Sequence, residues 1–157
     1  MASSFPSQES HCWENPWHKA AADRKVSRQE LEELYKKDKV GIDLKEGPKQ
    51  WTPLHVATRC DNTVAVDFIL DHATDVNAVD ADGNAAIHLV HVLLLHLFRS
   101  KRPAGLQRDI QDAEGNTVLH LSIKRNSVGE VSIPDDVIDF QSCHNVQNNE
   151  GLHPIHL

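Results

Sequence analysis

The chain has 157 residues, which is enough for one domain with a hydrophobic core and rules out a multi-domain enzyme. Charged residues make up 25% and hydrophobic residues 39%, and this balance excludes both a disordered polyelectrolyte and a membrane protein. The formal net charge of −7 argues against nucleic-acid binding, because contacts to phosphates need a basic face, and it favours a protein partner whose surface is basic or mixed.

The cysteines, the N-terminal residues and the most apolar segment indicate where in the cell the protein is located. Cys12, Cys60 and Cys143 are widely spaced and form no C-x-x-C pair, so neither a disulfide framework nor a zinc ribbon is indicated. The N-terminal residues lack the pattern of a secretory signal, and we expect a cytoplasmic, possibly nuclear, protein. The apolar stretch over 85–98 contains three histidines and is too short and polar to span a membrane, so we expect a buried helix.

The first predicted unit follows a flexible tail over residues 1–14. Pro16 precedes the alanines at 20–22, and the segment 27–44 has Leu31, Leu34 and Tyr35 on one helical face among many charged residues. An apolar inner face with a charged outer face is typical of the capping unit of a repeat array.

The second predicted unit is a pair of short helices. Thr52 is a good N-cap and Pro53 suits the first helical position, so the first helix begins at residue 52. Apolar side chains at 54, 56 and 57 and again over 64–70 mark the inner faces of two antiparallel helices. Neither helix can bury its apolar face alone, so the unit needs a stacked neighbour.

The third and fourth units are less regular. The third has Ala86 in the place of the proline, and basic residues over 99–102 ahead of Pro103 predict a helix end. In the fourth unit we expect a mobile loop over 126–134 and a short helix over 137–140. The last residues begin a fifth unit, which leaves the apolar face of the fourth open.

One pattern repeats through these units. WTPLHVA at 51–57, NAAIHLV at 84–90, NTVLHLS at 116–122 and LHPIHL at 152–157 align on four histidines that are 33, 32 and 36 residues apart. A fainter copy places His18 37 residues before the first of them. The last three copies follow turns that end in Gly83, Gly115 and Gly151, where glycine supplies a positive φ.

This pattern resembles the ankyrin repeat, and residues 51–83, with TPLHVA and the later DVN, carry the resemblance best. The resemblance implies an all-α ankyrin-repeat solenoid of paired antiparallel helices joined by hairpin loops. The expected domain is 15–157, divided into a cap repeat over 15–47, repeats over about 48–82, 83–114 and 115–150, and the start of a fifth repeat over 151–157.

The resemblance also implies a function: a small, non-enzymatic protein–protein interaction module or scaffold, without a cofactor, that binds its partner through the hairpin tips and the concave face of the first helices. Carried over to this sequence, the partner-binding residues are Trp51, Arg59, Cys60, Val79, Asp80, Asp82, Asn84, Gln111, Asp112, Glu114, Asn116, Lys124 and Arg125.

Some of these residues have a second explanation. An exposed tryptophan is typical of an interface anchor, but Trp51 can equally cover the junction between the cap and the second repeat. The acidic and amide residues at the tips can serve only to build the turns. This second explanation does not apply to Arg59, Lys124 and Arg125.

Three further interpretations stay open. The resemblance implies that the repeated histidines are structural, yet an enzyme or metal site would use residues outside the repeat register, namely His72, His91, His96 or Cys143, although no catalytic motif is present. The chain can also be a fragment of a larger ankyrin-repeat protein that serves as its scaffold domain. Finally, Asn77 in TDVN is similar to asparagines that a cytosolic hydroxylase modifies in ankyrin repeats.

Overall fold

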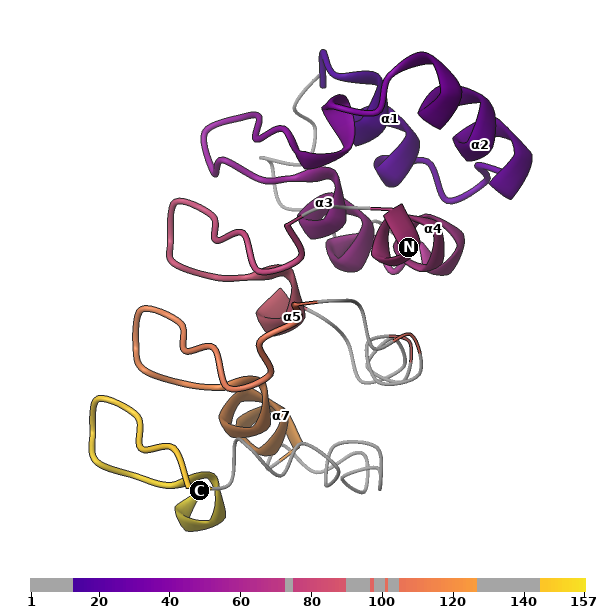
Figure 1. The fold of residues 1–157 in the computed structure, drawn as a ribbon. Coiled ribbons are helices and arrows are strands. Elements are labelled where there is room, and N and C mark those ends of the chain that lie inside the picture. Colours follow the sequence, from indigo (N-terminus) through magenta and orange to yellow (C-terminus); the bar gives the residue numbers. More distant parts are fainter. Residues whose placement is uncertain (1–12, 73–74, 90–96, 98–100, 102–104, 127–144) are drawn as a thin grey trace.

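The computed structural model describes residues 13–72, 75–89, 97, 101, 105–126 and 145–157. Within these residues, helices alternate with hairpin loops, and the only β pairing is two isolated bridges, Glu46–Trp51 and Val79–Ala85. The helices stack along one side and the hairpins project from the other, one below the next from the N-terminal to the C-terminal end (Figure 1). The predicted all-α solenoid of helices and hairpins is confirmed.

The N-terminal unit contains α1 (Pro16–Ala22) and α2 (Arg28–Lys37), followed by the 3₁₀ turn η2 (Gly41–Asp43). The Asn15 side chain accepts from the backbone N–H of Trp17 and so caps α1. The helical part of the segment 27–44 ends at Lys37, because the carboxylate of Asp38 accepts from the N–H groups of the next residues and turns the chain into η2.

The second unit contains α3 (Pro53–Arg59) and α4 (Thr63–His72). Thr52 caps α3, as its sequence position predicts. The buried Asn62 has a role that sequence reasoning missed. Its side-chain oxygen caps α4 at the Ala65 N–H, while its amide nitrogen donates to the carbonyls of Ala21 and Asp23, 3.0 and 2.9 Å away. One side chain thus starts a helix and holds it against the preceding unit.

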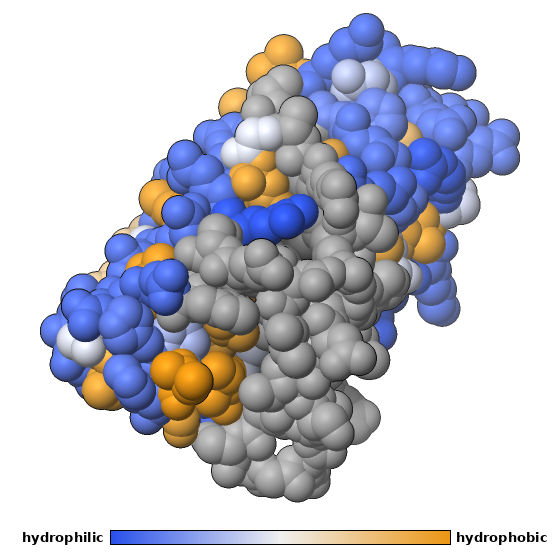
Figure 2. All heavy atoms as spheres, turned by 60° about the horizontal axis from the view of Figure 1, so that its bottom comes forward, coloured by the Kyte–Doolittle hydropathy of each residue, from blue (hydrophilic) through white to orange (hydrophobic). Residues whose placement is uncertain are grey.

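The later units are described in part. They contain α5 (Ala86–Leu89), α7 (Val118–Asn126) and the 3₁₀ turn η4 (Pro154–His156), which pack in that order below α3. The predicted helix end over 99–102, the loop over 126–134 and the helix over 137–140 lie largely or wholly outside the described residues. At the C-terminal end of the stack, Ile155 of η4 is 85% exposed, and hydrophobic side chains reach the surface at this end (Figure 2). The exposed residue belongs to the fifth unit, whereas Val118 and Leu119 of the fourth unit, whose apolar face was expected to be open, are buried.

The largest buried side chains gather between the first two units. The ring of Trp17 in α1 stacks on that of Phe68 in α4 at 6.1 Å between centroids, and Tyr35 in α2 meets the same phenylalanine edge-on at 6.1 Å. His72 also stacks on Phe68, at 4.2 Å between ring centroids. These contacts fix three helices around one aromatic ring.

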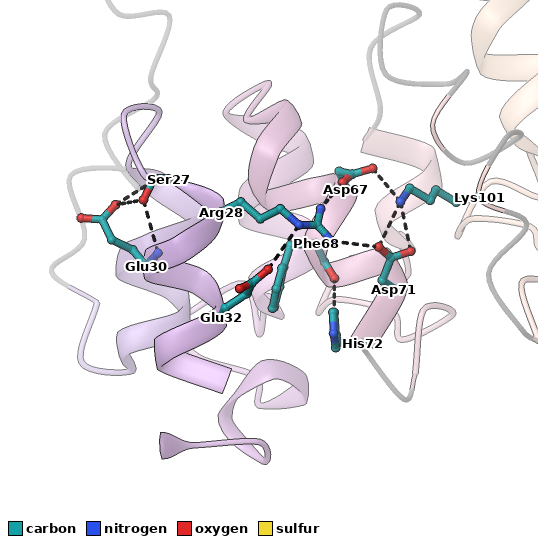
Figure 3. A network of polar contacts seen from close by, with 9 residues as sticks. All are labelled: Ser27, Arg28, Glu30, Glu32, Asp67, Phe68, Asp71, His72 and Lys101. Atoms are coloured by element: carbon teal, nitrogen blue, oxygen red, sulfur yellow. Dashed lines mark hydrogen bonds and ion pairs between the residues drawn. The ribbon is translucent and has the colours of Figure 1, made fainter. Parts of the chain in front are cut away.

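A network of ion pairs covers this aromatic cluster (Figure 3). Arg28 of α2 lies 2.6 Å from Asp67 and 3.5 Å from Asp71, both on α4, and Lys101 approaches the same two carboxylates to 2.8 and 3.0 Å. Burial raises the pKa of Asp67, but the hydrogen bonds and charges of Lys101 and Arg28 outweigh it and lower that pKa below its usual value. Single exposed pairs contribute little, whereas this network links residues far apart in sequence.

We predict that Leu54→Asp unfolds the second repeat and, through it, much of the stack. Leu54 is 2% exposed, and a buried carboxylate without a partner should lower the free energy of unfolding by about 4 kcal/mol or more. Urea denaturation followed by circular dichroism measures the change. The matched control is Leu44→Asp, because Leu44 is 50% exposed and the same substitution there should cost less than about 1 kcal/mol. Equal stability of the Leu54 variant and the wild type would contradict the repeat fold.

A second prediction concerns Gly83, which has a φ of +82°. Gly83→Val should lower the free energy of unfolding by about 1–3 kcal/mol, because a β-branched residue is strained in this backbone conformation. Gly83→Asn is the control and should cost less, since asparagine tolerates a positive φ better. Thermal denaturation of both variants checks the order, and a valine variant as stable as the asparagine variant would refute it.

Candidate protein-binding surface

The aligned histidines join neighbouring units. The ring of His55 accepts the backbone N–H of Thr52 at Nδ1 and, at Nε2, lies 2.8 Å from the carbonyl of Asn84 in the next hairpin. Because Nδ1 accepts, Nε2 carries the proton and donates. His120 repeats this arrangement, with its Nε2 3.0 Å from the carbonyl of Leu152. His18 Nε2 lies 2.7 Å from the carbonyl of Trp51. The structural role that the resemblance implies for these residues is confirmed.

His88 shows one difference of register. It accepts the N–H of Ala85 at Nδ1, but its Nε2 lies 2.9 Å from the carbonyl of Ile110, in the segment before the hairpin tip. In the three other pairs the acceptor lies after the tip, at Trp51, Asn84 or Leu152. In the third unit, whose sequence departs most from the pattern, the histidine therefore bonds to a carbonyl group at a different position of the next hairpin.

The hairpins form a connected row. The N–H of Ala81 donates to the carbonyl of Lys49 at 2.8 Å, and the N–H of Asn149 donates to the carbonyl of Glu114 at 3.0 Å. At Gly115 the next hairpin comes so close that an added Cβ would lie 2.5 Å from the Asn149 side chain. Between the second and third hairpins, a Cβ added at Gly83 would lie 3.4 Å from Ala113, so these two tips are also in contact. Such contacts hold the tip side chains in place relative to one another.

The acidic residues inside the turns are structural. Asp80 Oδ1 accepts from the N–H groups of Asp82 and Asn84, both at 2.9 Å, and Asp112 and Asn148 make the equivalent pair of bonds in the next two turns. The interpretation of these positions as turn builders is correct.

Four of the sequence-based binding candidates are buried, and this corrects their assignment to the partner-binding surface. For Trp51, Asp80 and Asn116, the second, structural explanation holds. Trp51 is only 7% exposed: its Nε1 donates to Asp80 Oδ2 at 3.0 Å and its ring stacks on Trp13 at 6.5 Å, so it covers the junction with the cap. Asp80, Asn116 and Cys60 are buried as well, at 7, 0 and 6% exposure. Asp80 and Asn116 make hydrogen bonds within their own hairpins and to a neighbouring one, and Cys60 ends α3 among the core side chains.

The remaining candidates reach the surface to different degrees. Exposed side chains are Arg59, Val79, Asp82, Gln111 and Glu114, and partly exposed ones are Asn84, Asp112 and Lys124. Asp82 is paired with Lys49 of the preceding tip at 2.7 Å, and Gln111 donates to the carbonyls of Gly115 and Gln147. The side chain of Arg125 lies outside the described part of the chain.

A groove of about 200 Å³ lies between the third and fourth hairpins. It brings together three of the candidates, Glu114, Asn116 and Lys124, with residues that sequence reasoning missed. Its lining consists of Ala113, Glu114, Asn116, Lys124, Asn148, Asn149 and Glu150. The signal for Glu150 was present in the sequence, because its turn ends in Gly151 like the two before it, but the turn was read only as the entry to a fifth repeat.

Asn77 lies partly buried at the base of the second hairpin. Its amide nitrogen donates to the carbonyl of Gly105 at 2.6 Å and its side-chain oxygen accepts the N–H of Gln107 at 2.8 Å. The side chain therefore links the second hairpin to the third, and its hydroxylation stays a prediction.

Among the described residues, no three His, Cys, Asp or Glu side chains gather in a way that would hold a metal ion. His72, one of the residues considered for an enzyme or metal site, stacks on Phe68 and bonds to its carbonyl through Nδ1. His91, His96 and Cys143 lie outside the described residues. The part of the chain that the structure describes contains no helix long and apolar enough to cross a membrane.

Comparison with known proteins identifies the repeat. Residues 49–81 match the family model "Ankyrin repeat". The chain therefore contains an ankyrin repeat over these residues, and the histidine contacts and hairpins described above continue a similar architecture on both sides of the match. An ankyrin repeat is a protein–protein interaction unit and not a catalytic one.

Three curated relatives are similar to parts of the chain. They are the human transient receptor potential cation channel subfamily A member 1 (26% identical over 67% of this chain), the nuclear factor NF-kappa-B p105 subunit of Gallus gallus (28% over 49%) and the palmitoyltransferase AKR1 of Lachancea kluyveri (26% over 78%). The matched regions span only 10, 8 and 17% of these proteins.

The buried histidine contacts predict a pH dependence of stability. Burial lowers the pKa of His55, although the hydrogen bond to Asn84 and the charge of Asp80 oppose this shift. The unfolded chain, with an ordinary pKa near 6.5, then binds more protons at low pH than the folded chain. The stability that the neutral ring contributes is therefore complete above about pH 6.5 and is lost progressively below it.

Two measurements check this prediction. Nuclear magnetic resonance of the His55 ring should show the Nε2–H tautomer and a pKa below the ordinary value. The free energy of unfolding should be lower at about pH 5.5 than at about pH 7.5. A ring of His55 that titrates above its ordinary pKa in the folded chain would contradict the assignment.

Proposed function

We propose that the chain binds a partner protein through its hairpin tips and the concave face of its first helices, and that the groove between the third and fourth hairpins is the centre of this surface. The observation that carries the proposal is the row of projecting hairpins (Figure 1), in which backbone hydrogen bonds join the first hairpin to the second and the third to the fourth. Charged side chains such as Asp82 and Glu114 are exposed at the tips. Because the tips are already ordered, little conformational entropy is lost when a partner binds.

The charge at the groove favours a partner segment with basic side chains. Glu114 and Glu150 place two carboxylates at its rim against one ammonium group, that of Lys124. Ala113 and the methylene groups of the lysine add apolar surface beside these charges. A lysine or arginine of the partner therefore gains favourable contacts with both carboxylates, in keeping with the net charge of −7.

The relatives support an interaction role without naming a partner for this chain. The activities in their names belong to proteins about six to twelve times longer than the matched segment, so these activities do not transfer to this chain. We propose a protein-interaction module rather than an ion channel, a transcription-factor subunit or a palmitoyltransferase. A cytoplasmic or nuclear location is part of the proposal and rests on the sequence alone.

The test is affinity capture from a cell lysate, with bound proteins identified by mass spectrometry and their affinities then measured with purified components. Glu114→Lys combined with Glu150→Lys reverses the charge of the groove and should weaken binding of the partner at least about tenfold. Glu32→Lys combined with Glu33→Lys is the matched control, since these exposed residues lie on α2, away from the hairpins.

The partner that the wild type and the α2 control bind equally, and that the groove variant loses, is the one the proposal expects. Circular dichroism of the groove variant must show that it remains folded. Binding that survives reversal of the groove charge, or that is lost in the α2 control, would refute the proposed surface.

A further inference from the structure

The connection between α1 and α2 presents two basic residues and a serine to solvent. Asp23, Arg24, Lys25 and Ser27 are exposed, while Val26 is buried and anchors the connection to the core. A turn closed by the Val26 N–H and the Asp23 carbonyl, at 3.1 Å, keeps the segment outside both helices. In the sequence Arg-Lys-Val-Ser, Arg24 and Lys25 lie three and two positions before Ser27, whose hydroxyl group is accessible.

The hydroxyl group of Ser27 sits at the start of α2. It donates to Glu30 Oε2 at 3.0 Å and accepts the N–H of Glu30, and the same carboxylate oxygen accepts the N–H of Ser27 at 2.7 Å (Figure 3). This capping box is local and solvent-exposed, so the hydroxyl is not buried behind other parts of the chain.

We propose that Ser27 is a phosphorylation site for a serine/threonine kinase that recognises basic residues at the second and third positions before its target. Such kinases select substrates by charge pattern, and Arg24 and Lys25 supply it. In the reaction, Ser27 Oγ attacks the γ-phosphorus of ATP, the bond from that phosphorus to the β–γ bridging oxygen breaks, and ADP leaves. The hydroxyl proton passes to the base of the kinase.

The phosphate would change the contacts of two neighbours. It has no proton to donate to Glu30 and carries a charge of about −2, so it repels the carboxylate that now completes the capping box. It attracts Arg28, the next residue, whose guanidinium group now bridges to Asp67 and Asp71 on α4. Phosphorylation thus draws Arg28 away from α4 and weakens the ion-pair network between the cap and the second repeat.

The test incubates the full chain with ATP and the catalytic subunit of cyclic-AMP-dependent protein kinase as the probe, and maps the phosphate by mass spectrometry. We expect about one phosphate per chain at Ser27. Ser27→Asn should abolish it while keeping the helix cap, because asparagine is as good an N-cap as serine. Arg24→Ala combined with Lys25→Ala should lower kcat/KM at least about tenfold.

Two controls separate this site from other causes. Lys36→Ala combined with Lys37→Ala removes an exposed basic pair at the far end of α2 and should leave the rate unchanged. Ser127 also follows two basic residues, Lys124 and Arg125, so Ser127→Ala must retain the Ser27 phosphate. Phosphate found only at Ser127, or a folded chain that is not modified while a peptide over 21–31 is, would overturn the proposal.

A spectroscopic readout tests the effect on Arg28. Its Nε–H resonance should shift on phosphorylation of the wild type and stay in place in the Ser27→Asn chain treated with kinase and ATP. If this resonance does not shift in a chain phosphorylated at Ser27, the phosphate does not compete with the α4 carboxylates for Arg28, and this part of the proposal is wrong.

Discussion

A neutral imidazole that bonds to two backbones at once is the interaction on which the rest of the stack depends. In the second and fourth units the same ring closes the first turn of its own helix and donates to the next hairpin. The helices are only seven to ten residues long and would be marginal alone. Because the same histidine ring caps its helix and binds the next hairpin, each helix is stable only when the neighbouring unit is folded. This dependence makes folding of the linear array cooperative.

The same architecture divides the hairpin residues between building and binding. Oδ1 of Asp80 and of Asp112 accepts hydrogen bonds from N–H groups of the turn, and the indole N–H of Trp51 donates to Oδ2 of Asp80. Glu114 and Glu150, two positions after the residues that close their turns, give only their backbone N–H groups to those residues, and their side chains line the groove. Neighbouring positions with similar chemistry therefore have different roles, and the turn geometry decides which is which.

The local features of the fold were predictable from the sequence, and the tertiary ones were not. Thr52, Pro53 and Gly83 act through their own backbone, so their types alone indicated a helix start and a turn. Burial of Trp51 and Cys60 depends on what packs against them from other units, and the hydrogen bond from the Asn62 amide to the Ala21 carbonyl of α1 depends on the same packing. For the candidate site, the repeat spacing located the hairpin turns, but only the relative placement of two turns in the structure showed which side chains line a common groove.

The uneven placement of the tryptophans has a practical consequence. The chain has three, at positions 13, 17 and 51, and all are buried in the cap or at its junction with the second repeat. Intrinsic fluorescence therefore reports on the N-terminal end of the stack alone. In a linear array whose ends differ in stability, the C-terminal repeats can unravel without changing this optical signal, whereas far-ultraviolet circular dichroism responds to every helix. A difference between the two unfolding curves would then measure how far the repeats unfold independently of the cap.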